Sequence, residues 1–165
     1  YSDFRAFERA FQLMVQVAGR AGRKGERGHV YIQSYKPEHP LLLDVQRSDY
    51  EHRAKLELDK RKHFHYPPFY RLIRLNVRHR DLDRVNRASE ALARPLRKRF
   101  PKEVLGPEFP AIARVRNQYH KNIMLKLAMG ESLQMAKELV TQLIEQLKDH
   151  SDFKGVRVVV DVDPQ

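Results

Sequence analysis

Arg71-Leu72-Ile73-Arg74-Leu75-Asn76-Val77 largely alternates between apolar and polar side chains. A period of two is typical of a β-strand that buries one face and leaves the other open. On the buried face we place Ile73, Leu75 and Val77. The opposite face is expected to carry Leu72, Arg74, Asn76 and Arg78. This part of the chain therefore predicts a sheet that is covered on one side only.

The segments that follow continue this pattern. Residues 82–99 and 131–148 carry apolar side chains at helical spacing, and residues 111–116, 121–128 and 156–162 are predicted strands. The resulting order is β-α-β-β-α-β, which is the split βαβ or ferredoxin-like arrangement. We therefore predict an α/β protein of the α+β type, with a four-stranded antiparallel sheet and two helices on one face.

The chain before this sheet is less regular. Residues 4–18 predict an amphipathic helix, residues 29–35 a short strand, and residues 49–65 a charged helix. Pro67 and Pro68 predict a hinge after that helix, because a proline disfavours helical backbone at the residue before it. We divide the chain into residues 1–48, residues 49–69 as a linker helix and hinge, and residues 70–165.

The net charge of +11 comes from 32 Lys and Arg against 21 Asp and Glu. It is concentrated in residues 70–118, where 13 basic and 5 acidic side chains give a net +8. Arginine predominates there, and its guanidinium group can bind phosphate oxygens in pairs. The window indicates a polyanionic partner. A solvated basic face without a partner is the alternative.

Composition excludes several classes of protein. The absence of cysteine excludes a disulfide scaffold and a cysteine-based zinc site in this sequence. Apolar runs such as Leu41–Leu43 are far shorter than the about 20 residues that cross a bilayer, so no transmembrane helix is predicted. His63 and His65 lack a third ligand at metal-site spacing, so no metal site is predicted. Tyr1 stands where an initiator Met would, so we expect a piece of a longer chain.

The alternation predicts what lies on the open face of the sheet. Six basic residues from all four predicted strands would meet there: Arg74, Arg78, Arg114, Arg116, Lys126 and Arg157. Such a cluster is typical of a surface that binds a nucleic-acid backbone. Surface aromatics that would stack bases are missing, which favours recognition of backbone or junction shape. The alternative is that this face packs on another domain, with its arginines in ion pairs.

One short motif carries chemistry. Gln16-Val17-Ala18-Gly19-Arg20-Ala21-Gly22-Arg23 fits the pattern Q-x-x-G-R-x-G-R. Its two guanidinium groups can point into one cleft, and its glycines allow a tight turn. Arginine beside a γ-phosphate neutralises the charge that develops during phosphoryl transfer. The alternative is a helix C-cap with Arg-Gly filler.

This motif resembles the last motif of the second motor lobe in superfamily-two helicases. Together with Asp3–Leu13 before it, Gln16–Arg23 is similar to the last helicase segment of the primosomal replication-restart DNA helicase PriA (primosomal protein N′) family. Further stretches occur in the same order as in that family: Ile32–Pro40, Tyr66–Phe69, Leu105–Pro107 and Asp161–Pro164. The resemblance spans essentially all 165 residues.

The resemblance implies a parent enzyme that is an ATP-driven 3′→5′ DNA helicase in the bacterial cytoplasm, associated with the nucleoid. It implies that residues 1–48 end the second RecA-like lobe and that residues 70–165 form the family's C-terminal DNA- and partner-binding domain. The implied partners are branched fork DNA, single-stranded DNA, the acidic tail of the single-stranded DNA-binding protein and the primosome loading proteins. No membrane partner is implied.

The resemblance also assigns residues to the nucleotide. Gln16, Gly19, Arg20 and Arg23 would face the γ-phosphate of ATP, with Arg20 and Arg23 catalytic and Arg23 the arginine finger. The sequence has no G-x-x-x-x-G-K-[ST] phosphate loop and no Asp-Glu box for Mg²⁺, so we expect this piece alone to be inactive. The family's zinc lies in a cysteine-rich insert that is absent from this sequence, and we expect no cofactor in this piece by itself.

A second hypothesis is a non-enzymatic RNA-binding module on a ribosomal-protein-like fold. It would explain the basic window at residues 70–118 but would leave the motif at Gln16–Arg23 without a role.

Overall fold

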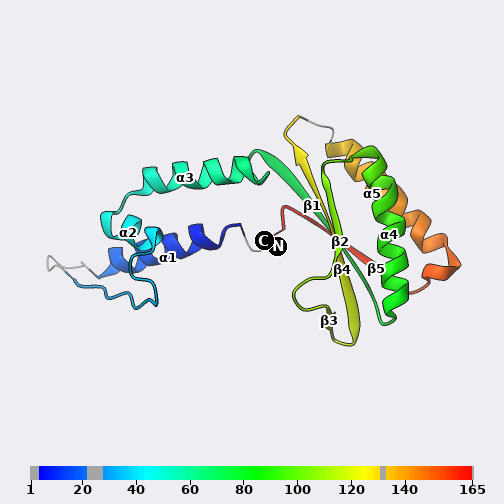
Figure 1. Ribbon diagram of the computed structural model, residues 1–165, viewed down its shortest axis with the longest axis horizontal. Coiled ribbons are helices and arrows are strands. Elements are labelled where there is room, and N and C mark those ends of the chain that lie inside the picture. Colours follow the sequence, from blue (N-terminus) through cyan, green and yellow to red (C-terminus); the bar gives the residue numbers. More distant parts are fainter. Residues whose placement is uncertain (1–3, 22–27, 131–132, 165) are drawn as a thin grey trace. The chain divides into compact units, whose positions relative to one another are not determined.

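The computed structural model describes residues 4–21, 28–130 and 133–164 (Figure 1). The chain forms two compact units, one that ends at Phe64 and one that runs from His65 to Pro164. Each unit has its own hydrophobic core, and the core of the second unit is much the larger. Among the described residues, none of the helices is long and apolar enough to cross a membrane.

The first unit is built from helices. They are α1 (Ala6–Arg20), α2 (Pro40–Arg47) and α3 (Tyr50–His63). The His39 side chain accepts a hydrogen bond from the backbone of Leu41 at the start of α2, and Asp49 accepts one from the backbone of His52 at the start of α3. These caps satisfy backbone N–H groups that have no partner inside the helix. A small core of Phe11, Leu41 and Val45 holds α1 and α2 together.

Two predictions for the first unit are wrong. Residues 29–35 are not a strand, and Tyr31 is 92% exposed. The β-forming side chains there have no neighbouring strand to pair with, since the described part of this unit contains only helices. The first helix also continues beyond residue 18 to Arg20, so that Gly19 is helical. The described residues of the first unit do not show that residues 1–48 end a RecA-like lobe, as the resemblance implies.

The second unit contains the sheet that the alternating segment predicted. Its elements are β1 (Tyr70–His79), α4 (Leu82–Arg99), β2 (Val104–Glu108), β3 (Arg114–Val115), β4 (Gln118–Ala128), α5 (Leu133–Asp149), the 3-10 helix η1 (Ser151–Phe153) and β5 (Arg157–Val162). Asp81 caps α4, and its hydrogen bond from the backbone of Arg84 holds the pKa of the Asp81 carboxyl below its usual value. The strand at 71–77 and the helix at 82–99 are confirmed.

The sheet is antiparallel and has five strands rather than the predicted four. The strand order is β2-β4-β1-β5, and β3 pairs only with β4. The predicted strand at 111–116 is reduced to Arg114–Val115, because Arg116 and Asn117 adopt left-handed backbone with φ of 47° and 60° and close a hairpin onto Tyr119. The strand β2 pairs with the other edge of β4 and was not predicted from the sequence.

Both helices of the second unit lie on one side of the sheet (Figure 1). The buried strand residues on that side include Ile73, Leu75, Ile123 and Leu125, which pack against α4 and α5. Val160 pairs with Leu75 and therefore lies on the same face. It is nevertheless 43% exposed, because β5 is an edge strand. Neither α4 nor α5 lies on the other side of the sheet (Figure 1).

Candidate functional site

The end of α1 presents three of the four residues assigned to the nucleotide. Gln16, Gly19 and Arg20 are all exposed, whereas Phe11 on the same helix is buried. Residues three and four apart share a face of a helix, so these three side-chain positions form one polar strip. Arg23 lies outside the described residues. The structure therefore describes Gln16–Ala21 of the motif and leaves the grouping of its two arginines as a prediction.

Gly19 is not required by its surroundings in this chain. A Cβ atom added there would meet nothing within 4 Å. Glycine in a helix interior costs about 1 kcal/mol relative to alanine, so the chain gains nothing locally from this residue. The expectation that Gly19 makes a tight turn is wrong, since it is helical. A glycine at this exposed position would allow another group to approach the helix backbone closely.

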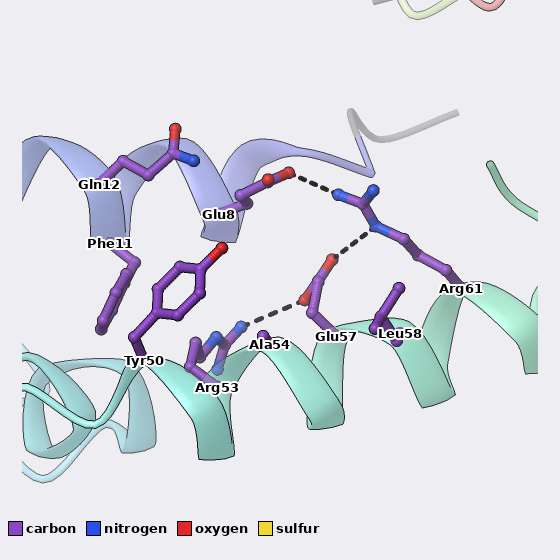
Figure 2. A pocket seen from close by; sticks show the side chains of 9 residues that line it. All are labelled: Glu8, Phe11, Gln12, Tyr50, Arg53, Ala54, Glu57, Leu58 and Arg61. Atoms are coloured by element: carbon purple, nitrogen blue, oxygen red, sulfur yellow. Dashed lines mark hydrogen bonds and ion pairs between the residues drawn. The ribbon is translucent and has the colours of Figure 1, made fainter. Parts of the chain in front are cut away.

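Ion pairs tie α1 to α3. Arg61 on α3 donates to Glu8 on α1 at 2.5 Å, and its Nε lies 3.6 Å from a carboxylate oxygen of Glu57. Figure 2 shows these side chains around a cavity of about 160 Å³ between the two helices, whose apolar lining includes Phe11 and the ring of Tyr50. The pairs hold the first turn of α1, the helix that contains Gln16, Gly19 and Arg20.

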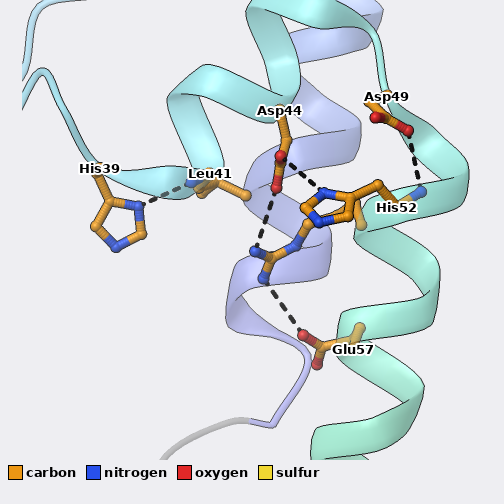
Figure 3. Close-up of polar contacts among 7 residues, drawn as sticks. His39, Leu41, Asp44, Asp49, His52 and Glu57 are labelled. Atoms are coloured by element: carbon orange, nitrogen blue, oxygen red, sulfur yellow. Dashed lines mark hydrogen bonds and ion pairs between the residues drawn. The ribbon is translucent and has the colours of Figure 1, made fainter.

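A second set of ion pairs joins α3 to α2. Arg53 lies 3.7 Å from Asp44 and 3.3 Å from Glu57, and His52 lies 3.3 Å from Asp44 (Figure 3). Arg53 is only 6% exposed and Asp44 only 5%. A charge this deeply buried is tolerated only when it is paired, and here two carboxylates neutralise one guanidinium. This cluster links α2 to α3.

The open face of the sheet in the second unit is arranged in rows. Strand register places Arg78 beside His120 on β4 and beside Arg157 on β5. The next row across the three strands is Asn122, Asn76 and Val159, and the third is Met124, Arg74 and Asp161. A neutral row that carries two amide side chains therefore lies between two rows that contain charges.

Hydrogen bonds fix the middle of this face. Nδ2 of Asn76 donates to Oδ1 of Asn122 at 2.8 Å, and Nδ1 of His120 lies 3.1 Å from Oδ1 of Asn76. In the third row, Arg74 donates to Asp161 at 2.6 Å. Arg74 is thus neutralised within the unit, as the ion-pair alternative for this face predicted.

Arg78 and Arg157 differ from Arg74. Their Cα positions are paired across β1 and β5, and neither guanidinium has an acidic partner within residues 4–21, 28–130 and 133–164. The Nε atom of Arg78 is buried and makes no hydrogen bond to any described residue. Like charges directly opposite each other destabilise a sheet. The pair therefore forms a site of unbalanced positive charge.

The other three predicted basic residues lie away from this pair. Arg114 hydrogen-bonds to Asn117 and lies over the ring of Tyr119, at 5.1 Å from its centroid, and Arg116 sits in the hairpin turn. Lys126 lies over the ring of Tyr66 at 3.8 Å. The six basic residues are thus not one continuous patch.

Burial lowers the pKa of Lys126 below its usual value. Lys126 lines a separate pocket whose other members include His65 and Tyr70. It lies on the open face by register, opposite Leu72 on β1, but two rows beyond the amide row. Its environment is therefore distinct from that of Arg78.

A cavity of about 370 Å³ lies over the open face. Its floor includes Asn76, Asn122 and His120, and its lining also includes Pro110 and Ile112, which precede β3, and Val115 on β3. Asn122 and His120 were not predicted as site residues, because Asn122 carries no charge and His120 precedes the predicted strand at 121–128. Extending the alternation of β4 backward from Lys126 through Met124 would have placed both on the open face.

Within the part of the chain that is described, no cluster of three or more His, Cys, Asp or Glu side chains could hold a metal ion.

Comparisons with known proteins agree on one family. Residues 62–165 match the family described as the primosomal protein N C-terminal domain. The chain is 32% identical over 164 residues to the replication restart protein PriA of Bacillus subtilis, covering 98% of this chain and 20% of the relative. The PriA proteins of Treponema pallidum and Haemophilus influenzae are 36% and 35% identical over 98% and 99% of this chain, and the chain covers 24% and 22% of their lengths.

The chain thus spans only about a fifth to a quarter of the length of the curated relatives that it matches. The family match covers both helices and all strands of the second unit, and the matches to the relatives extend over the first unit as well. The chain belongs to the PriA family of replication restart proteins, and its residues 62–165 are that family's C-terminal domain.

Proposed function

We propose that this chain is the C-terminal part of an ATP-dependent 3′→5′ DNA helicase that recognises stalled or abandoned replication forks and directs primosome assembly. The family match and the motif at Gln16–Arg23 support this proposal. Its partners would be branched and single-stranded DNA, the tail of the single-stranded DNA-binding protein and the primosome loading proteins. It would act in the bacterial cytoplasm at the nucleoid.

In this proposal the end of α1 serves the nucleotide. Gln16, Arg20 and Arg23 would lie at the γ-phosphate of ATP, and bound ATP with Mg²⁺ would supply the transferable phosphoryl group. The exposed strip on α1 and the open space at Gly19 fit such an approach. The phosphate loop and the Mg²⁺ ligands would come from the remainder of the helicase, and the zinc from its cysteine-rich insert. This chain alone would then hydrolyse no ATP.

The second unit would bind the DNA backbone through its open sheet face. The observation that carries this proposal is the cross-strand pair of Arg78 and Arg157, two like charges without an acidic partner among the described residues. A phosphate between two guanidinium groups would remove their repulsion and accept charge-assisted hydrogen bonds from both. Arg114 and Arg116 on the hairpin would extend the contact.

Reversing both charges of this pair is expected to weaken DNA binding. The variant Arg78→Glu with Arg157→Glu should lower the affinity of the chain for fork DNA at least about tenfold and reduce the slope of log K against log salt by about 2, because each phosphate contact contributes about 0.9 to that slope. Fluorescence anisotropy over a range of salt concentrations measures both quantities.

A matched control separates this pair from net charge alone. Arg87→Glu with Arg94→Glu changes the charge by the same amount on α4, on the covered side of the sheet. We expect this control to lose much less affinity. Equal losses in both double variants would contradict a specific contact at Arg78 and Arg157, and no salt-dependent DNA binding by the unaltered chain would contradict the DNA-binding role of this unit.

The RNA-binding alternative is not favoured, since the matched relatives are replication restart proteins. Comparing fork DNA with structured RNA at equal salt tests the choice directly, and the proposal predicts the tighter complex with the fork.

A further inference from the structure

The floor of the cavity over the open sheet face contains side chains that binding of a DNA backbone does not require. A phosphate-binding surface requires cations, yet the middle row of this face is neutral and carries the amides of Asn76 and Asn122. The cations lie to either side of it. Arg78 is free of any acidic partner among the described residues, whereas Arg74 is neutralised by Asp161. The cavity is thus polarised, with its positive end at Arg78.

The amide of Asn122 is held in a fixed orientation with unused hydrogen-bonding capacity. Its Oδ1 accepts from Asn76, which is held in turn by His120. Its NH₂ group has no partner among the described residues, and its Oδ1 retains a second lone pair. An asparagine side chain with a free donor beside a free acceptor pairs with the edge of adenine, which offers N6–H and N7 side by side.

The lining of the cavity also includes apolar side chains. Ile112, Val115 and Val159 line it and are 69%, 43% and 42% exposed. Val159 lies in the same row of the sheet face as Asn76, so a flat ring that enters on its edge would meet aliphatic side chains as well as the amides. Stacking against aromatic residues is not available here, so the ring would be held by aliphatic contact and by hydrogen bonds at its edge.

We propose that this cavity binds one unstacked base of single-stranded DNA, with adenine preferred. Asn122 contacts the edge of the base, Asn76 and His120 position Asn122, and the adjoining phosphate lies at Arg78 and Arg157. This inference rests on the proposed DNA-binding role of the second unit. It adds that the second unit contacts a base of the DNA in addition to the DNA backbone.

The test uses the whole chain and three short single-stranded oligonucleotides. Each is a thymidine oligomer of the same length, with a central adenine, a central thymine or a central abasic site. Because a bidentate contact to a base edge typically changes affinity by about 5- to 150-fold, the adenine oligomer should bind at least about fivefold more tightly than the abasic one. The thymine oligomer should fall between them. Calorimetric titration at fixed salt gives the three affinities.

Two variants probe the cavity itself. Asn122→Ala should reduce the ratio of adenine to abasic affinity to about one, while the salt dependence of binding stays unchanged. Ile112→Glu should also abolish the preference for adenine over the abasic site, because it places a carboxylate beside the apolar lining. Ile112 is highly exposed, so its replacement should not unfold the unit. Gln134→Ala removes an exposed amide from α5 and should leave the ratio intact.

The outcomes separate this inference from the proposed function. Equal affinity of the unaltered chain for the adenine and abasic oligomers would overturn base binding and leave backbone binding standing. A preference that survives in both Asn122→Ala and Ile112→Glu would overturn the assignment to this cavity. If the chain shows no salt-dependent affinity for any of the three oligomers, the proposed function fails together with this inference.

Discussion

Arg23→Ala in the intact helicase is expected to lower kcat for ATP hydrolysis by about 10³- to 10⁵-fold, the range measured for arginine fingers. The guanidinium group would act on charge that develops only during phosphoryl transfer, so the affinity for ATP should change little. Steady-state hydrolysis and equilibrium binding of a fluorescent nucleotide measure the two effects separately. Arg20→Ala is expected to lower turnover as well, since Arg20 lies in the exposed strip with Gln16.

Arg47→Ala is a suitable control for this experiment. Arg47 is an exposed arginine in the last turn of α2, and no role in the nucleotide site is proposed for it. Its replacement should leave turnover close to that of the unaltered enzyme. Full turnover in Arg23→Ala would contradict the arginine-finger assignment, and a large loss of ATP affinity without a loss of kcat would show a binding role instead.

Arg53→Ala is expected to lower the free energy of unfolding of the first unit by about 3–5 kcal/mol, the usual cost of removing one partner of a buried ion pair. The change would leave the buried carboxylate of Asp44 with only His52 beside it, while Glu57 keeps its contact with Arg61. Loss of the Arg53 pairs should loosen the packing of α2 on α3. Urea denaturation measures the free energy of unfolding. Hydrogen exchange of the α1, α2 and α3 amides shows which helices lose protection.

Two further variants make this result specific. Arg53→Met with Asp44→Leu removes both charges of the buried pair that joins α3 to α2 and should recover much of the lost stability, because a hydrophobic replacement of a buried pair is often neutral or better. Arg47→Ala on the surface should change the free energy of unfolding by no more than about 0.5 kcal/mol. A cost below 1 kcal/mol for Arg53→Ala would contradict a structural role for the cluster.

The parts of the fold with a strong period could be predicted from the sequence. The helix at residues 82–99 and the alternation at residues 71–77 match α4 and β1 closely, because burial against a single core imposes their spacing. The strand β2 could not be predicted in this way. It has only five residues, and Gly106 and Pro107 interrupt any alternation within it.

Tertiary context explains the remaining differences. Residues 29–35 have strand-forming side chains, but a strand needs a partner and the described part of the first unit offers none. Arg116 was placed on a strand, yet the hairpin turns at this residue with left-handed backbone. Asn117 is a residue that favours a turn, but Arg116 gives no sign that the turn begins one residue earlier.

The basic side chains of the candidate site could be predicted from the sequence, but their ion-pair and hydrogen-bond partners could not. Arg74 and Arg78 both alternate onto the open face, and nothing in the sequence says that Asp161 pairs with the first and not with the second. That difference depends on strand register across β1 and β5, which only the structure gives. The amides of Asn76 and Asn122 meet for the same reason, since they are 46 residues apart in the chain.

The most direct test of the open sheet face as the DNA contact is a nuclear magnetic resonance titration of the ¹⁵N-labelled chain with single-stranded DNA. If the open sheet face contacts DNA, the Arg78 Nε–H and Asn122 side-chain NH₂ signals shift progressively and added salt reverses the shifts. The NH₂ signal of Gln134 on α5, which lies on the covered side, should stay in place. Shifts confined to α4 and α5, with the Arg78 and Asn122 signals unmoved at saturating DNA, would contradict it.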